Sequence, residues 1–598
     1  MRRNLHFLEY LFCHLLLIFL LGRVGFMLYN NSIEDFGPGD VFSACKNGLL
    51  AHDALLSSVL LAMPWLVSLL ALHWPKLPLR ALLSPYYLVI GIVVGVLIVA
   101  DAVMYEFWQF KLGYVVLSYA SSPEGTTNSV SIGFLLSRAL TLIALITFIT
   151  VPCILLTPKR LEGTSAEKQW FRNISIIWTF MLVCSVFTLR VGNAYYSPSL
   201  FLNHAATNPV LAFVSTIPKD TEHPDHRLYL NEATCEEVFQ DLYPESTEDI
   251  TDTLLIHPRP NVLLVFMESF GGKFVEELGG IPNVSPNLSR LIPEGIFWEN
   301  YYSNSFRTDR GTVSTYSGWP SYPVRSIMKQ VHCHEKLPSI AKSLEKQGYQ
   351  TSYLYPGPMT NMGKRQYLAN MHFNELLDDT AFEPHEINSS WGANDSTSAM
   401  KTYHLIAQKD TISRWFMAYQ TISSHEPWDV PYHRLQDKIL NAFAYTDHCV
   451  GQLVDSLRTL PAWDNMLVII IPDHGFLYQQ SFQDPEFFHN PMLWLGGAIR
   501  KPRSMKVLMN QSDLAATLLS QMQITHREYP WSRNVLSANY TYPFAYCNFP
   551  AGVLFKDSTG VSIFDLTALC PIIESPTDDG VRALKAKAIL QTSNDALE

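Results

Sequence analysis

The stretch Ile469-Ile470-Ile471-Pro472-Asp473-His474-Gly475 decides the fold, because an apolar strand ends there on an acid, an imidazole and a glycine. A second stretch, 261–269 (NVLLVFMES), has the same form and places Glu268 after another apolar run. Short apolar runs of this kind are typical of strands that are buried on both faces of a parallel sheet. Open α/β sheets bind ligands at the carboxyl ends of their strands. We therefore expect Glu268, Asp473 and His474 to meet at one edge of a sheet.

A hydroxyl flanked by two guanidinium groups lies between these strands, in the sequence 305–311 (SFRTDRG). The oxygens of Glu268 and Asp473 and the imidazole of His474 form a mixed ligand set that suits Mn²⁺ or Zn²⁺ better than Ca²⁺. Thr308 is a candidate fourth ligand and, with its pKa lowered by the metal, a candidate nucleophile. Arg307 and Arg310 are candidates to stabilise phosphate oxygens, although only one of them need point inward. The three segments together predict a site for metal-assisted phosphoryl transfer.

From about residue 258 onward, segments with strand character alternate with segments with helix character. This alternation predicts a mainly parallel sheet that is covered by helices on both faces. Near the end, an alternating stretch at 541–566 predicts a small antiparallel hairpin appended to the sheet. The expected strands are 261–266, 296–302, 351–355, 415–421, 466–471 and 491–495, and the expected helices start near 285 and 308 or cover 337–347, 436–459 and 512–522.

The N-terminal third is much more apolar than the rest of the chain. Each of its apolar segments has about the 20 residues that a helix needs to cross a bilayer. Several such runs with short polar breaks argue against buried core helices of a soluble protein. We therefore predict a transmembrane domain, 1–192, with five helices at about 7–28, 53–72, 84–106, 132–156 and 173–191.

The distribution of basic residues predicts the orientation of these helices. Arg2 and Arg3 precede the first span, Lys76 and Arg80 follow the second, and four basic residues lie between the fourth and fifth. The positive-inside rule then places the N-terminus in the cytoplasm. With five spans, a connector at 193–257 and a catalytic domain at 258–598 would lie outside the cell membrane.

Composition restricts the possible partners. The formal net charge of −11 argues against a broad nucleic-acid surface, which normally needs a basic face. None of the nine cysteines belongs to a CxxC pair, so a thiolate zinc site is not expected.

The motifs, taken in order, resemble a known family. Met-Glu-Ser at 267–269, Arg-Thr-Asp-Arg-Gly at 307–311, Ser-Ser-His-Glu-Pro-Trp at 423–428 and Pro-Asp-His-Gly at 472–475 are similar to those of lipoteichoic acid synthases, in the alkaline phosphatase and sulfatase superfamily. The resemblance implies that Glu268, Thr308, Asp473 and His474 bind one metal, usually manganese, with zinc or magnesium as alternatives. It also implies that Thr308 is the nucleophile. For the substrate, it implies contacts from His425, Trp428 and His489.

The sequence departs from the family pattern in one loop. Related enzymes often carry an acid or histidine there for the glycerol head group, whereas this chain has Tyr355-Pro356-Gly357-Pro358. The sequence therefore does not identify the head group that the enzyme would transfer.

Three functional hypotheses remain. The first is a membrane-anchored transferase that moves phosphoglycerol, or a related head group, from a phospholipid such as phosphatidylglycerol to a glycan or lipid acceptor. Its intermediate would be a phospho-threonine at Thr308. The second is a phosphoethanolamine transferase, or a phosphodiesterase or sulfatase-like hydrolase that uses water. The third is a non-catalytic membrane protein whose outer domain serves interaction or sensing.

Overall fold

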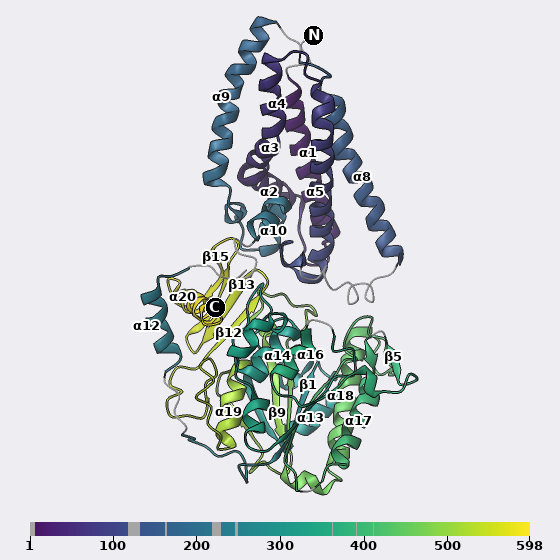
Figure 1. The fold of residues 1–598 in the computed structure, drawn as a ribbon, viewed down its shortest axis with the longest axis vertical. Helices are drawn as coiled ribbons and strands as arrows, with labels where there is room; N and C mark the ends of the chain where they lie inside the picture. Colours follow the sequence, from purple (N-terminus) through teal and green to yellow (C-terminus); the bar gives the residue numbers. More distant parts are fainter. Residues whose placement is uncertain are drawn as a thin grey trace. The chain divides into compact units, whose positions relative to one another are not determined.

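The protein was analysed as a computed structural model that describes residues 6–117, 132–161, 164–217, 229–244, 249–360, 363–389, 391–410 and 412–598. The chain forms two compact units (Figure 1). The first comprises residues 1–219 together with 565–572, and the second comprises 220–564 and 573–598.

The first unit is helical. Its long helices pack through apolar side chains such as Leu11, Leu15, Val94 and Ile149. The α-helices are α1 (Phe7–Tyr29), α2 (Pro38–Gly48), α3 (Ala54–Leu60), α4 (Ala62–His73), α5 (Leu79–Trp108), α8 (Ile132–Leu156), α9 (Ser165–Thr188), α10 (Leu200–Ala206) and α11 (Pro209–Ser215).

Among the described residues, three helices of this unit are long and apolar enough to cross a membrane, namely α1, α5 and α8. They coincide with the first, third and fourth predicted spans. The second predicted span belongs to a helix pair, Pro38–Leu60 and Ala62–His73, which is bent by 42° and would make a fourth crossing if it is one span. The fifth predicted segment lies mainly within α9, and its crossing of a membrane stays a prediction.

The second unit is built on a mixed sheet of nine strands in the order β10-β2-β9-β8-β1-β7-β3-β4, with β11 also paired to β2. The mostly parallel arrangement agrees with the predicted α/β class, but β9 runs antiparallel to both β2 and β8. The strands are β1 (Asn261–Met267), β2 (Ile296–Tyr302), β3 (Gln350–Leu354), β4 (Glu375–Leu377), β7 (Trp415–Gln420), β8 (Met466–Pro472), β9 (His489–Leu495), β10 (Arg503–Met505) and β11 (Met509–Asn510).

The register of the central strands sets the position of the site. Strand β1 pairs in parallel with β8 on one side, where Met267 lies opposite Pro472, and with β7 on the other, where Phe266 lies opposite Gln420. Glu268, Asp473 and Thr421 therefore leave three adjacent parallel strands at the same edge.

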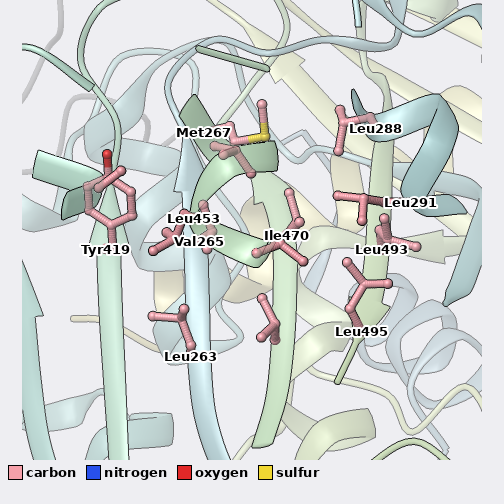
Figure 2. Close-up of a cluster of buried hydrophobic side chains, with 14 of the residues drawn as sticks. Leu263, Val265, Met267, Leu288, Leu291, Tyr419, Leu453, Ile470, Leu493 and Leu495 are labelled. Carbon is pink, nitrogen blue, oxygen red and sulfur yellow. The ribbon is translucent and has the colours of Figure 1, made fainter. Parts of the chain in front are cut away.

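Alternate residues of these strands form two apolar faces, as period-two side-chain directions require. Figure 2 shows one face, where Val265 of β1 and Ile470 of β8 lie beside Leu493 of β9. Leu288 of α13 (Pro286–Leu291) and Leu453 of α18 (Lys438–Leu457) cover them. On the opposite face, the ring of Phe266 packs 5.8 Å from that of Tyr316 in α14 (Thr308–Ser317). Further α-helices of the second unit are α15 (Ile340–Glu345), α16 (Lys364–Asn370), α17 (Asp395–Ala407) and α19 (Leu514–Gln521).

The C-terminal segment corrects one expectation. The stretch at 541–566 is not a hairpin added to the main sheet but part of a separate four-stranded antiparallel sheet, in the order β12-β13-β14-β15. The alternating pattern around Asp557-Ser558-Thr559-Gly560 predicted one hairpin of two strands, whereas the structure has four strands. These strands are β12 (Phe544–Phe549), β13 (Gly552–Asp557), β14 (Gly560–Asp565) and β15 (Cys570–Ser575), and the neighbouring helices are α12 (Glu232–Leu242) and α20 (Val581–Asp595).

Candidate active site

The structure brings Glu268, Asp473 and His474 together at the carboxyl ends of β1 and β8. Each offers one ligand atom, and these atoms all lie within 4.8 Å of one another in a buried position. Nε2 of His474 is 3.4 Å from Oδ2 of Asp473 and 3.7 Å from Oε1 of Glu268. Parallel strands end at the same edge, so residues that are about 200 positions apart meet here.

Thr308 completes this cluster from the first turn of α14. Its hydroxyl lies 3.2 Å from both carboxylate oxygens of Glu268 and 3.5 Å from Nε2 of His474. Gly311 allows this approach, because a Cβ at that position would lie 2.2 Å from the carbonyl oxygen of Asp473. The glycine of the Arg-Thr-Asp-Arg-Gly motif thus lets the helix that carries Thr308 pack directly against the strand end that carries Asp473.

The donor set fits a divalent metal. Oδ1 of Asp473 accepts from the backbone N–H of Ser269 at 2.6 Å and from that of His474 at 2.9 Å. Oδ2 is buried without a hydrogen-bond partner in the part of the chain that the structure describes. A buried carboxylate oxygen without a partner is costly unless a cation binds it.

The imidazole of His474 is also arranged for a ligand. Its Nδ1 lies 2.7 Å from the carbonyl oxygen of Gly475, to which it donates as an N–H. The tautomer is then fixed with the lone pair on Nε2, which faces the two carboxylates. Glu268, Asp473 and His474 can therefore bind a metal, with Thr308 beside them.

Electrostatics in the cluster are dominated by two neighbouring carboxylates. Burial and the charge of Glu268 raise the pKa of Asp473 to about 6. Burial also acts to raise the pKa of Glu268, but the nearby His425 and His474 lower it to well below its usual range. One carboxylate thus stays charged while the other holds its proton more readily, as expected for two acids that share one site.

His425 is brought to the same place by the loop after β7. Its Nε2 lies 3.3 Å from Oε1 of Glu268, and its ring stacks on Trp391 at 4.3 Å between centroids. Burial acts to lower the pKa of His425, but the carboxylates of Glu268 and Glu426 raise it to about 10. The protonated form of His425 is therefore favoured, and it places a positive charge next to the two carboxylates.

The two arginines of the motif differ in position. Arg307 is half-buried, and its charge contributes to lowering the pKa of Glu426 beside His425. Arg310 is buried and donates to the carbonyl oxygens of Tyr322 and Val324, both at 2.8 Å. The structure thus uses Arg310 to hold the following loop rather than bringing it to the cluster.

Two other residues that were predicted to bind the substrate, His489 and Trp428, make their contacts with residues outside the cluster. His489 opens β9, with Nδ1 2.7 Å from Glu486 and Nε2 2.6 Å from the carbonyl oxygen of Glu299. Trp428 follows His425 in the same loop, and its ring packs edge-on at 6.3 Å from that of Phe476. Neither is brought into contact with Glu268 or Asp473, and their roles stay predictions.

Sequence reasoning missed the residues that hold Glu268 in place. Ser269 donates from Oγ to Oε1 of Glu268 at 2.9 Å, and Gln420 donates from Nε2 to Oε2 at 3.0 Å. Ser424 donates to the carbonyl oxygen of Glu268 at 2.7 Å. The signal for Ser269 and Ser424 was their place in the motifs. Gln420 offered a further signal, because an amide is unusual in an otherwise apolar strand.

Comparisons with known proteins agree with this geometry. The family described as Sulfatase matches residues 260–524. The ulvan-active sulfatase of Formosa agariphila is 22% identical over 383 residues, which cover 55% of this chain and 60% of that protein. Phosphoglycerol transferase I of Xanthomonas campestris pv. campestris is 22% identical over 306 residues, which cover 47% of this chain and 43% of that protein. The chain thus spans about half the length of the curated relatives it matches.

Solved structures show the same fold. The lipoteichoic acid synthase LtaP of Listeria monocytogenes superposes with a TM-score of 0.50 at 15% identity, over 61% of this chain and 98% of that one. The integral membrane phosphoethanolamine transferase of Neisseria meningitidis superposes with a TM-score of 0.52 at 13% identity, over 89% of this chain and 97% of that one. The second match extends the similarity into the helical unit.

Proposed function

Since its α/β domain belongs to the sulfatase/alkaline phosphatase superfamily, we propose that this protein is a membrane-anchored, metal-dependent head-group transferase that uses Thr308 as nucleophile. The observation that carries the proposal is the cluster of a threonine hydroxyl, two carboxylates and one imidazole around a buried carboxylate oxygen without a partner. Distant homology to phosphoglycerol transferase I supports a lipid-derived head group as substrate.

In this proposal Glu268, Asp473, His474 and Thr308 hold one divalent ion, with Mn²⁺ favoured and Zn²⁺ or Mg²⁺ as alternatives. The ion would lower the pKa of the threonine hydroxyl and offset phosphoryl charge. The adjacent Glu268 carboxylate, 3.2 Å away, accepts the hydrogen bond of the Thr308 hydroxyl and so orients its oxygen. The cationic His425 stabilises a phosphoryl oxygen, and Arg307 is a second candidate for that role.

The reaction has two in-line steps. The hydroxyl oxygen of Thr308 attacks the phosphorus of a phospholipid such as phosphatidylglycerol. The bond between phosphorus and diacylglycerol breaks, and diacylglycerol leaves with the proton of the Thr308 hydroxyl. A hydroxyl of a glycan or lipid acceptor then attacks the phosphorus of the phospho-threonine, the bond between phosphorus and the Thr308 oxygen breaks, and that oxygen takes the acceptor's proton. Helices that cross the membrane would keep the site near its lipid substrate, on the outer face of the cell membrane if the positive-inside assignment holds. The domain limits 1–192, 193–257 and 258–598 belong to the same proposal.

The experiment uses purified full-length protein with Mn²⁺ and two labelled lipids, phosphatidylglycerol and phosphatidylethanolamine. Release of diacylglycerol, together with mass spectrometry of the group trapped on Thr308, identifies the head group. Thr308→Ala is expected to release none, while Thr459→Ala, which alters an exposed threonine after α18, should behave as wild type. Release by Thr308→Ala at the wild-type rate would refute the nucleophile.

A phosphoethanolamine transferase is the second candidate. The structural match to such an enzyme covers both units of this chain, although it bears on the fold alone. The loop Tyr355-Pro356-Gly357-Pro358 also lacks the acid expected for a glycerol head group. A phosphoethanolamine group on Thr308 would select this candidate, and a group lost only to water would instead indicate a hydrolase.

A further inference from the structure

Gln420, the last residue of β7, is fully buried directly beside the end of β1. Its Nε2 donates to Oε2 of Glu268 at 3.0 Å. The other carboxylate oxygen, Oε1, receives the hydroxyl of Ser269 at 2.9 Å. Each oxygen of the carboxylate is therefore held by one neutral donor. Oε1 also lies 3.3 Å from Nε2 of His425, so Oε2 is the oxygen with fewer partners and the better placed to bind a metal.

The orientation of the Gln420 amide is fixed by two donors on its far side. Its Oε1 accepts from Nζ of Lys364 and from the hydroxyl of Tyr353, both at 2.8 Å. An ammonium group has donors and no acceptor, so the amide oxygen must face Lys364. The amide nitrogen must then face Glu268, because a flipped amide would place its oxygen against a carboxylate oxygen.

Lys364 is placed to act through this amide rather than on a substrate. It is 6% exposed, at the start of α16, and its ammonium lies 3.7 Å from the centroid of the Tyr355 ring. Burial lowers the pKa of Lys364 to about 8, while the carboxylates of Glu268 and Asp473 favour its charged form. Its positive charge thus lies directly behind the carboxylate cluster.

We propose that Gln420, oriented by Lys364 and Tyr353, is a positioning residue that fixes the Glu268 carboxylate for metal binding. This inference rests on the proposed function only in taking a divalent metal as part of the site. Groups that orient a metal ligand typically change metal affinity by 10–100-fold when they are removed.

A purely structural role for Gln420 makes a different prediction from a positioning role. Gln420→Met keeps the size of the side chain but leaves the buried ammonium of Lys364 without its acceptor, which destabilises the fold. In the double variant Gln420→Met/Lys364→Met that ammonium is gone, so stability should return in part, while the buried hydroxyl of Tyr353 still lacks this acceptor. The donor to Glu268 is still missing, so metal affinity should not return.

The test titrates Mn²⁺ alone into metal-free full-length protein in detergent and records thermal unfolding in EDTA. We expect Gln420→Met to bind Mn²⁺ about 10–100-fold more weakly than wild type. Gln408→Met, which removes an exposed glutamine at the end of α17, serves as control and should match wild type in both measurements. The double variant should unfold at a higher temperature than Gln420→Met and still bind Mn²⁺ weakly.

Two results would overturn the inference alone. One is wild-type Mn²⁺ affinity in folded Gln420→Met, and the other is recovery of affinity together with stability in the double variant, which would assign the effect to packing. If wild type itself binds no Mn²⁺, the proposed function falls and takes this inference with it. Mn²⁺ binding by wild type with no lipid turnover would leave the inference intact and refute the transferase.

Discussion

Each unit of the protein buries a group of charges, and the two groups are completed in different ways. In the helical unit, Arg23 donates to Asp53 through two hydrogen bonds of 2.8 and 3.1 Å and also to the carbonyl oxygens of Ala205 and Ala206. Asn208 donates to the same carboxylate at 2.8 Å. In the α/β unit, Glu268 and Asp473 lie together, and one oxygen of Asp473 has no partner in the described structure.

The difference separates a structural ion pair from a site built for a ligand. Opposite charges with their hydrogen bonds satisfied need nothing further, although the desolvation of both ions limits how much they stabilise. Two carboxylates at close range raise the energy of the fold until a cation binds. Removing one charge of the Arg23–Asp53 pair should therefore destabilise the helical unit. Removing one carboxylate charge from the metal-free cluster should instead relieve repulsion in the α/β unit.

The largest expected effect is the loss of activity when a ligand charge is removed. Glu268→Gln keeps the shape of the side chain but should lower metal-dependent diacylglycerol release by about 10⁴-fold, roughly 5 kcal/mol of transition-state stabilisation. Glu277→Gln, at an exposed position, is the matched control. Metal-dependent release by Glu268→Gln within tenfold of wild type would show that the cluster is not the reaction centre.

The second-largest effect concerns the ion pair between Arg23 and Asp53, in which both charges have partners. Arg23→Met leaves the Asp53 carboxylate buried and without its cation, which should destabilise the helical unit by about 3–5 kcal/mol. Thermal unfolding in detergent measures the loss, and Arg23→Met/Asp53→Leu should recover part of it. If the single variant unfolds like wild type, the pair does not contribute as the comparison requires.

Mn²⁺ should stabilise the α/β unit, which contains the cluster of Glu268, Asp473 and His474, and should not stabilise the helical unit. At a free Mn²⁺ concentration of 100 times the dissociation constant, the α/β unit should gain about 2.7 kcal/mol, and EDTA should reverse this gain. Asp473→Asn should abolish the gain. An equal gain in the variant would place the Mn²⁺ elsewhere.

The smallest effect is the pH dependence of the metal-free protein. The pKa of Asp473 in the folded protein is about 6, above its ordinary value of 3.8, so the folded state binds this proton more tightly than the unfolded state. The stability due to Asp473 is thus present below about pH 4 and lost as the pH rises through 6. Between these limits, wild type should lose roughly 1–2 kcal/mol more than Asp473→Asn.

Unfolding in urea at a series of pH values with EDTA measures this difference. With Mn²⁺ present the trend should reverse, because binding needs the ionised carboxylate. A wild-type profile that parallels that of Asp473→Asn would show that neither burial nor the charge of Glu268 raises the pKa of Asp473.

The amino-acid sequence by itself determined the strand ends and the chemistry that they carry. Apolar runs before Glu268 and before Asp473-His474 sufficed to predict a parallel sheet with acids at one edge, because both patterns are local along the chain. The same locality predicted the apolar helices α1, α5 and α8.

Only the tertiary structure decided which polar residues serve the site. Arg307 and Arg310 are equivalent in the motif, yet Arg310 donates to carbonyl oxygens in the loop after α14. Gln420 and Lys364 are 56 positions apart, and nothing local marks them as a pair. Strand register and helix packing bring such groups together, and these depend on contacts between distant segments. A short sequence pattern fixes the types of residues available, whereas the direction of each side chain depends on that packing.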